Sequence, residues 1–324
     1  MRAAGRTEYG SADVIRIVDV PLPEPGPHQV RVRVEAAGVD IGVWHMMTGL
    51  PTMARLAIGF GRPRSPVLGA ELAGVVDAVG TRVTRFRPGD AVFGVGAGSF
   101  AEYALSTEKQ LVPLPDGVTA QHAAASAVSG VTAHQALVRE GRIAAGHRVL
   151  ILGASGGVGS FAVQIAKALG ARVTGVASGA KLDFVRGLGA DETLDYATTD
   201  ATDGSRAYDL VLEMGGLRPL RVLRRSLAPT GRAIIVGGEG GGRVTGGFLR
   251  GMTAGIASAP HRRKVTGLVS VTTASDLAAV GELIASGAVV PAIQEVLPLD
   301  ALPDALRSLE SHQVRGKLVI DPTR

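Results

Sequence analysis

The stretch His147-Arg-Val-Leu-Ile-Leu-Gly-Ala-Ser-Gly-Gly-Val-Gly159 runs from an apolar, β-branched segment into a glycine-rich turn. It continues as Ser160-Phe-Ala-Val-Gln-Ile-Ala-Lys167, where we expect a helix, and Arg172–Val176 predicts a second strand. This order is typical of the half-unit that binds a dinucleotide, because a turn without side chains lets a pyrophosphate reach the N–H groups of a helix N-terminus. We predict that the turn binds a dinucleotide through Ala154, Ser155, Gly156, Gly157, Val158 and Gly159, although Ala154 replaces the first glycine of the G-x-G-x-x-G pattern.

The end of the second predicted strand indicates which cofactor is bound. NAD sites place an acid there, about 20 residues past the glycines, to accept a hydrogen bond from the ribose 2′-OH. Here the strand runs into Ala177-Ser-Gly-Ala-Lys181, and the next acid is Asp183. Ser178 can donate to a 2′-phosphate and Lys181 can supply a compensating charge, although a solvated surface lysine is the alternative for Lys181. We therefore predict NADPH.

Length and composition limit the class of protein. A chain of 324 residues with 46% hydrophobic and 19% charged residues suits two globular domains. The N-terminal residues lack the apolar core of a signal peptide, and no apolar run reaches the roughly 18 residues of a membrane span. The chain has no cysteine, which excludes disulfides and cysteine-bound metals. We predict a cytoplasmic protein with no membrane partner.

The formal charge of +5 raises the question of nucleic-acid binding. The basic residues are dispersed, and at 4% the aromatic residues are too few to offer a stacking surface for bases. A mildly basic surface that attracts an anionic cofactor explains the charge better. We predict no nucleic-acid partner.

The pattern along the chain changes from β to α/β. Gln29–Glu35 alternates apolar with polar or charged residues, and further short strands are expected over 67–80, 90–94 and 100–105. Helices are expected over 120–140 and 275–286, and a last strand over 314–320. Ligands bind at the carboxyl ends of strands in open α/β sheets. The glycines that follow two later strands are therefore predicted to line the cofactor groove: Gly215, Gly216, Gly237 and Gly238.

One ordered set of stretches covers nearly the whole chain: Pro25–Pro27, Val32–Gly38, Gly69–Gly74, Phe86–Phe93, Ser129–Ala133, Gly153–Gly159, Leu188–Tyr196 and Arg315–Ile320. Together they resemble the medium-chain dehydrogenase/reductases, above all their zinc-independent, quinone oxidoreductase-like branch. The resemblance implies an α/β fold with a GroES-like catalytic β domain over 1–119 and 275–324. A Rossmann domain with a doubly wound parallel sheet, over 120–274, would be inserted into it. It further implies an active site between the domains and a homodimer formed through the Rossmann sheet edge.

The resemblance also assigns cofactor contacts. Ser178 and Lys181 match positions that contact the 2′-phosphate, and Tyr196 matches a tyrosine at the adenosine end. Thr132, Gly237 and Lys317 match positions near the cofactor. From the residues alone, Thr132 could instead cap a helix, and Tyr196 could be a core aromatic.

The chain departs from the zinc-dependent branch at the metal ligands. Where those enzymes have a cysteine and a histidine, this sequence has Asp40 and Ala70, followed by Glu71. Two carboxylates make a poor zinc site, which needs three protein ligands rich in nitrogen or sulfur. We predict no metal.

Without a Lewis acid, an unactivated ketone lacks a group to hold alkoxide charge, whereas a quinone, enone or enoyl compound delocalises that charge itself. We therefore predict hydride transfer from NADPH to a conjugated carbonyl. Asp40 and His45 are the candidate catalytic residues; the alternatives are a helix cap for Asp40 and a backbone-bonded loop histidine for His45. Trp44, Met47 and Phe60 are predicted to wall the pocket, with Leu50–Ser65 as a lid.

Two other functions stay open. The first is a zinc-free alcohol dehydrogenase or ketoreductase with Asp40, His45 or Glu71 as its acid and base. The second is a non-catalytic protein that binds NADPH and also RNA.

Overall fold

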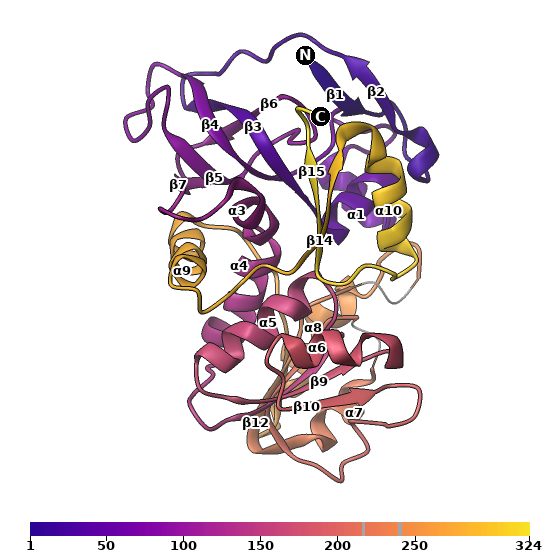
Figure 1. The fold of residues 1–324 in the computed structure, drawn as a ribbon. Coiled ribbons are helices and arrows are strands. Elements are labelled where there is room, and N and C mark those ends of the chain that lie inside the picture. The colour runs from indigo at the N-terminus through magenta and orange to yellow at the C-terminus, as the bar shows by residue number, and fades with distance from the viewer. Residues whose placement is uncertain (216–217, 239–241) are drawn as a thin grey trace. The chain divides into compact units, whose positions relative to one another are not determined.

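The computed structural model describes residues 1–215, 218–238 and 242–324, and their contacts divide the chain into two compact units (Figure 1). The first unit comprises Met1–Val131 and Thr272–Arg324, and the second comprises Thr132–Val271. The first unit is therefore built from both ends of the chain.

The first unit is built on a seven-stranded sheet. Its strands pair in the order β14 (Ile293–Pro298), β15 (Lys317–Asp321), β3 (Gln29–Val39), β4 (Glu71–Val79), β5 (Ala91–Val95) and β7 (Leu111–Pro113), and β6 (Tyr103–Thr107) pairs with β3. A two-stranded sheet joins β1 (Arg2–Gly5) to β2 (Arg16–Asp19). The predicted alternation in β3 is confirmed, since Val30, Val32 and Val34 are fully buried.

Short helices complete the first unit: α1 (Ile41–Thr48), α2 (Arg55–Ile58), α3 (Ala120–Ser126), α9 (Ala274–Ala285) and α10 (Leu302–Glu310). Single 3-10 turns cover Ala12–Val14, Thr52–Ala54 and Leu299–Ala301. The apolar faces of α1 and α10 join the sheet core through Val43, Met47, Leu302 and Leu306. Helix α4 (Ser129–His134) crosses the boundary between the units and continues as a π-helical segment, Gln135–Glu140.

The second unit is an open sheet of six parallel strands. Their order is β10 (Glu192–Asp195), β9 (Arg172–Ala177), β8 (Arg148–Leu152), β11 (Tyr208–Glu213), β12 (Leu227–Ile235) and β13 (Lys264–Gly267). Helices α5 (Gly157–Ala168), α6 (Leu182–Gly187), α7 (Leu220–Arg225) and α8 (Phe248–Ser258) connect the strands, with a 3-10 turn at Gly179–Lys181. In chain order the strands run 3-2-1-4-5-6, which is the Rossmann arrangement. The GroES-like and Rossmann fold class predicted from the sequence is confirmed.

Three features were not expected from the sequence. Strand β12 begins at Leu227 and continues through Pro229–Gly231, because the pairing register with β11 jumps there and these residues protrude from the strand as an irregularity. Lys264–Gly267 forms the edge strand β13. Helix α10 was not expected, although it buries Leu302, Ala305 and Leu306 on one face.

Candidate active site

The glycine turn lies between β8 and α5 in the second unit. Gly153 has a φ of +90°, a left-handed conformation that favours glycine, so it makes the sharp turn out of the strand. At Gly156 the nearest atom to an added Cβ is 3.6 Å away, which leaves its backbone open. At Gly159 an added Cβ would lie 2.1 Å from the Gly153 carbonyl oxygen, so only glycine lets α5 pack this closely on the strand. Helix α5 then begins at Gly157.

Ala154 occupies the place of the missing first glycine, and it is fully buried. An added Cβ on Gly175 of the neighbouring strand β9 would lie 3.2 Å from the Ala154 Cβ. Glycine at 175 therefore leaves room for Val185, whose Cγ1 lies 2.5 Å from the same position, and for the methyl group of Ala154.

The ends of β8 and β11 meet at the point where the strand order reverses, which is where ligands bind in open α/β sheets. Gly215 follows β11 directly. Gly237 follows β12, and an added Cβ there would lie 1.6 Å from the Met214 carbonyl oxygen, so the two strand ends approach closely only with glycine. Gly216 lies outside the described residues.

Ser178 and Lys181 flank the 3-10 turn at the end of β9, and the Lys181 N–H donates to the Ser178 carbonyl at 2.8 Å. Tyr196 is 61% exposed, so it is a surface aromatic and not a core one. The sequence reading missed Asp195, whose Oδ2 lies 2.7 Å from the position of an added Cβ on Gly179. The end of β9 carries no acid, but Asp195 at the end of β10 approaches the turn that follows β9.

Thr132 does not cap a helix through its side chain. It lies within α4 and is 8% exposed, and its hydroxyl donates to Ser270 Oγ at 3.0 Å.

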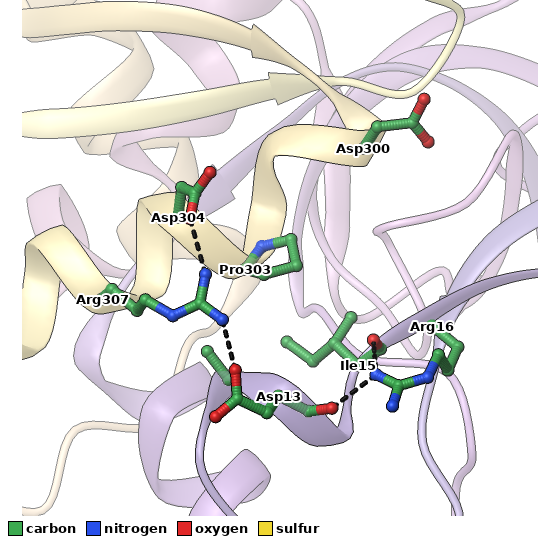
Figure 2. A pocket seen from close by; sticks show the side chains of 8 residues that line it. Asp13, Ile15, Arg16, Asp300, Pro303, Asp304 and Arg307 are labelled. Carbon is green, nitrogen blue, oxygen red and sulfur yellow. Dashed lines mark hydrogen bonds and ion pairs between the residues drawn. The ribbon is translucent and has the colours of Figure 1, made fainter.

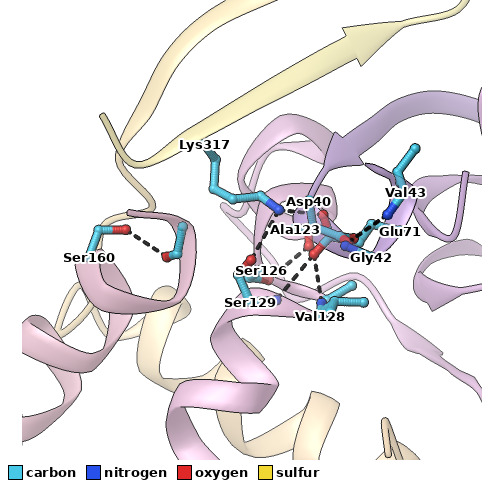
Figure 3. A network of polar contacts seen from close by, with 12 residues as sticks. Asp40, Gly42, Val43, Glu71, Ala123, Ser126, Val128, Ser129, Ser160 and Lys317 are labelled. Carbon is cyan, nitrogen blue, oxygen red and sulfur yellow. Dashed lines mark hydrogen bonds and ion pairs between the residues drawn. The ribbon is translucent and has the colours of Figure 1, made fainter. Parts of the chain in front are cut away.

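A buried polar network occupies the first unit (Figure 3). Lys317 Nζ lies 2.6 Å from Glu71 Oε2 and 3.1 Å from Ser129 Oγ, and the Lys317 and Glu71 side chains are 1% and 0% exposed. Glu71 Oε1 accepts the N–H groups of Val128 at 2.7 Å and Ser129 at 3.2 Å, which anchors the start of α4. An added Cβ on Gly38 would lie 2.0 Å from Glu71 Oε2, so glycine at 38 makes room for the carboxylate.

Burial raises the pKa of Glu71 to about 7, with the negative charge of Asp40 adding to the rise. The Lys317 ammonium and the Val128 N–H oppose that rise but do not cancel it. Lys317, predicted from the resemblance to lie near the cofactor, has its ammonium directed to Glu71 and Ser129 in this structure.

Asp40 and His45 lie at opposite ends of α1. Asp40 is its N-cap, and Oδ1 accepts the N–H groups of Gly42 at 2.5 Å and Val43 at 3.3 Å. His45 Nδ1 lies 2.7 Å from the Leu50 carbonyl oxygen. A carbonyl only accepts, so Nδ1 carries the hydrogen and the neutral ring leaves Nε2 as an acceptor. The structure therefore contains the helix cap and the backbone-bonded histidine, and within the described residues no hydrogen bond or ion pair joins the two side chains.

The three predicted pocket residues have different environments. Met47 is 1% exposed within the hydrophobic core, Trp44 packs against that core, and Phe60 is 80% exposed. Trp44 and His45 are in edge contact with ring centroids 5.1 Å apart. The structure thus brings Trp44 to His45 but does not bring Met47 and Phe60 to one surface.

A hollow of about 410 Å³ opens elsewhere on the first unit, between Ala12–Arg16 and the start of α10 (Figure 2). Most of its charges are paired: Arg307 bonds Asp304 at 2.6 Å and also bonds Asp13, and Asp300 forms an ion pair with Arg2 at 2.8 Å. Arg16 donates to the backbone carbonyls of Asp13 and Ile15. None of the predicted site residues lines the hollow.

The residues at the zinc positions do not fit zinc. Ala70 has no donor, Asp40 Oδ1 is occupied by two backbone N–H groups, and the Glu71 carboxylate already holds an ammonium at 2.6 Å. A divalent cation at that carboxylate would stand beside the positive charge of Lys317. No cluster of three metal-ligating side chains occurs in the described ranges. Those ranges likewise contain no helix long and apolar enough to cross a membrane.

Comparison with known proteins agrees with this fold. The alcohol dehydrogenase GroES-like domain model matches residues 26–116, and the zinc-binding dehydrogenase model matches residues 188–320. A chloroplast envelope quinone oxidoreductase homolog of Arabidopsis thaliana is 31% identical, covering 99% of this chain and 98% of that protein. The quinone oxidoreductase of Homo sapiens is 33% identical over 74% of each chain.

Comparison with solved structures also agrees with this fold. The quinone oxidoreductase from Coxiella burnetii superposes with a TM-score of 0.86 at 26% identity, covering 99% of both chains. An NAD-dependent alcohol dehydrogenase gives 0.83 at 30% identity, also over 99% of both chains. A mycobacterial protein complexed with NADPH gives 0.83 at 27% identity, over 99% of this chain and 100% of that one.

A GroES-like domain joined to a Rossmann domain defines the class of medium-chain dehydrogenase/reductases, whose cofactor is a nicotinamide dinucleotide. The chain belongs to the quinone oxidoreductase branch of that superfamily. It is an oxidoreductase that acts on a small molecule.

Two features of the first unit escaped the sequence reading. The Glu71–Lys317 pair is one; both residues were named from the sequence, but each is the first residue of a strand that also contains an aspartate, so the sequence carries no signal that they pair. The other is Arg6, which is 6% exposed directly after β1. Charged residues also stand at Arg2 and Glu8, so the sequence does not single out Arg6 as buried.

Proposed function

We propose that this protein transfers a hydride from NADPH to a conjugated carbonyl acceptor, a quinone, enone or enoyl compound, without a metal. The observation that carries the proposal is the environment of Glu71, which pairs with Lys317 at 2.6 Å directly after Ala70, the position where the zinc-dependent branch has a histidine ligand. The names of the quinone oxidoreductase relatives support the same reading.

The residues present fit the dinucleotide. The Gly153 turn, the open Gly156 backbone and the first N–H groups of α5 suit a pyrophosphate at a helix N-terminus. Ser178, Lys181 and Tyr196 lie at the strand ends where the adenosine end would bind, and Gly215 and Gly237 lie at the strand ends nearest the reversal of strand order. When bound, the nicotinamide supplies the hydride.

His45 is the candidate proton donor, and its hydrogen bond decides how it acts. Because Nδ1–H donates to Leu50, Nε2 can donate only when the ring is an imidazolium. His45 would thus act as a general acid toward the oxygen or carbon that gains negative charge, and the acid form would be required for turnover. Asp40 orders α1 as its cap and in that way places His45.

Two substitutions at His45 separate proton transfer from loop anchoring. An asparagine amide can take the place of Nδ1–H, whereas a glutamine amide reaches toward the place of Nε2. If His45 is the acid, both His45→Asn and His45→Gln lower kcat by about a hundredfold and leave the Kd for NADPH unchanged. If His45 only anchors Leu50, His45→Asn keeps near wild-type kcat.

A panel of acceptors tests the proposal as a whole. The protein should oxidise NADPH with quinones and enones but not with simple ketones, and NADPH should be preferred over NADH. Oxidation of simple alcohols with NAD would instead identify the alcohol dehydrogenase alternative, which the structural neighbour of that name favours. NADPH binding without turnover of any acceptor would leave only the non-catalytic alternative.

The second unit also supports the proposal of a homodimer. Strand β13 is the edge of the six-stranded sheet, and α8 contacts it. Leu249, Met252 and Ile256 of α8 are 51%, 59% and 79% exposed at helical spacing, which is a large apolar stripe for a monomer. Sedimentation should give a dimer for wild type, and Met252→Glu with Ile256→Glu should give a monomer; an unchanged mass for the variant would overturn this interface.

A further inference from the structure

The segment that connects β3 to β4 has an unusual charge composition. Between the cap residue Asp40 and Glu71, residues 41–70 contain three arginines and one histidine but no aspartate or glutamate. This segment includes α1 with His45, the residue proposed as proton donor, and the predicted lid. The excess positive charge therefore lies on the same chain segment as that residue.

Arg6 adds a fourth guanidinium to this segment from the N-terminal strand. It is 6% exposed, and it donates to the Met46 carbonyl at 2.6 Å and to the Ser65 carbonyl at 3.2 Å, while Nε has no partner. Arg6 also lies 5.8 Å from the centre of the Tyr9 ring. Burial lowers the pKa of Arg6, and the Tyr9 hydroxyl opposes that shift. A buried cation that is not paired with a carboxylate is costly.

The other arginines are held by backbone groups and leave their charge uncompensated. Arg55 donates to the Gly49 carbonyl at 3.0 Å and lies 4.4 Å above the same Tyr9 ring as Arg6. Arg64 donates to the Ala57 carbonyl at 3.0 Å, and Arg62 is exposed. None of the four forms an ion pair within the part of the chain that the structure describes.

The loop that carries two of these arginines has a defined backbone. Gly59 has a φ of +123°, and an added Cβ there would lie 2.1 Å from the Arg62 carbonyl oxygen. The Arg64 N–H donates to the Ile58 carbonyl at 2.9 Å, and Tyr9 Oη donates to the Gly59 carbonyl at 2.6 Å. Arg62 and Arg64 are thus presented on a closed, hydrogen-bonded turn.

Apolar side chains are exposed beside the arginines. Met53, Leu56 and Phe60 are 37%, 70% and 80% exposed in the same segment. A surface that joins exposed apolar groups to uncompensated guanidinium groups suits a ligand with an apolar body and an anionic group, because guanidinium binds carboxylate and phosphate oxygens through paired N–H donors.

We propose that the acceptor reduced by this protein is an anion, and that the arginines of the 41–70 segment, with Arg62 and Arg64 foremost, bind its carboxylate or phosphate group. This rests on the proposed reduction of a conjugated carbonyl and narrows its substrate class. A neutral quinone is then a poorer substrate than an acid or thioester of comparable reactivity that carries negative charge.

The test compares matched acceptors that differ in charge. One pair is 3-benzoylacrylate and its methyl ester, in which the charge is a carboxylate next to the enone. The other pair is crotonyl-coenzyme A and crotonyl-pantetheine, in which the charge lies on phosphates. In at least one pair the anion should have the higher kcat/KM, and the difference should shrink as salt is raised from 20 to 500 mM. The pair that responds identifies the source of the charge.

Arg62→Gln combined with Arg64→Gln removes two charges and keeps a donor for the Ala57 carbonyl. This variant should lose roughly fivefold to tenfold in kcat/KM for the anion and little for its neutral partner. Arg82→Gln is the matched control, because Arg82 is exposed in the same unit and lies outside the segment. It should change neither value.

Calorimetric binding of 3-benzoylacrylate and of coenzyme A to the protein loaded with NADP⁺, which cannot donate a hydride, gives a second readout that does not need turnover. Weaker binding by the double variant but not by Arg82→Gln supports the anion site, even if none of the acceptors is reduced. Failure to reduce any acceptor would overturn only the proposed reaction. Equal kcat/KM within both pairs, together with binding that the double variant does not change, overturns the anion site and leaves the proposed reduction intact.

Discussion

Replacing Lys317 by methionine is the sharpest test of the buried network in the first unit. The substitution keeps an unbranched apolar side chain, shorter by one atom, and removes the ammonium that lies 2.6 Å from Glu71. The Glu71 carboxylate would then be buried with only its backbone donors Val128 and Ser129. We expect a large loss of stability because an uncompensated buried charge is left behind.

Breaking a buried ion pair by removing one partner costs about 3–5 kcal/mol, whereas an exposed pair contributes about 1 kcal/mol or less. Arg2→Met is the control, since the Arg2–Asp300 pair has a similar distance of 2.8 Å in the same unit but is 41% and 64% exposed. The double variant Glu71→Gln with Lys317→Met should recover much of the loss, because it removes both charges and keeps the packing.

The contribution of Glu71 to the free energy of unfolding changes with pH in a definite direction. The pKa of Glu71 is raised from 4.5 to about 7, so between these values the folded state binds more protons than the unfolded state. The contribution of Glu71 to stability is present below pH 4.5 and is lost as the pH rises to about 7. The full difference corresponds to roughly 3 kcal/mol at 1.36 kcal/mol per pKa unit. This pH-dependent contribution should be absent from the double variant. The loss of stability caused by Lys317→Met should be larger at pH 8 than at pH 5.5.

Urea denaturation followed by tryptophan fluorescence measures these effects in the first unit alone, because Trp44 is the single tryptophan of the chain and lies there. The difference between wild type and the double variant from pH 4.5 to 8 isolates the contribution of Glu71. Equal losses for Lys317→Met and Arg2→Met, or a difference that grows with pH, would refute the reasoning.

Three further predictions concern the cofactor turn and α1. Gly159→Ala should lower the melting temperature and abolish NADPH binding, because its Cβ would lie 2.1 Å from a backbone carbonyl oxygen. Gly156→Ala should weaken NADPH binding and leave the melting temperature within a few degrees. A normal fold and normal binding for Gly159→Ala would contradict this. Ser178→Ala with Lys181→Ala should raise the Kd for NADPH about tenfold and leave that for NADH unchanged in fluorescence titrations, and a parallel change for both would count against a 2′-phosphate site. Asp40→Ala should cost about 1 kcal/mol in urea denaturation and Asp40→Asn much less, because asparagine still caps α1, so an equal cost for the two would rule out capping as the cause.

The second unit was largely predictable because its signals are local. The strand, turn and helix around Gly153–Gly159 follow one another in sequence, and the apolar runs of buried parallel strands are visible without any partner. Gly215 and Gly237 could be placed at strand ends for the same reason. What sequence could not show is that Asp195, on another strand, approaches the turn at Gly179.

The first unit was less predictable because its contacts join distant parts of the chain. Glu71 and Lys317 are separated by 246 positions, and the sequence of neither strand alone indicates which residue its charged side chain contacts. The pocket assigned to Trp44 and Met47 depended on which face of α1 is buried, and helical spacing does not decide that in a short helix with apolar residues on several faces. Phe60 lies in the loop after α2, where no periodic pattern indicates its direction. Met47 turned into the core and Phe60 toward solvent.

The contact between Ala154 and Gly175 has a consequence for how such chains are recognised. A scan that scores each motif position separately penalises alanine at 154, yet the methyl group it adds is accommodated by a vacancy on the adjacent strand. The sizes of the residues at positions 154 and 175 are therefore coupled. A search that scores the two positions together would detect dinucleotide-binding folds that the glycine pattern alone misses.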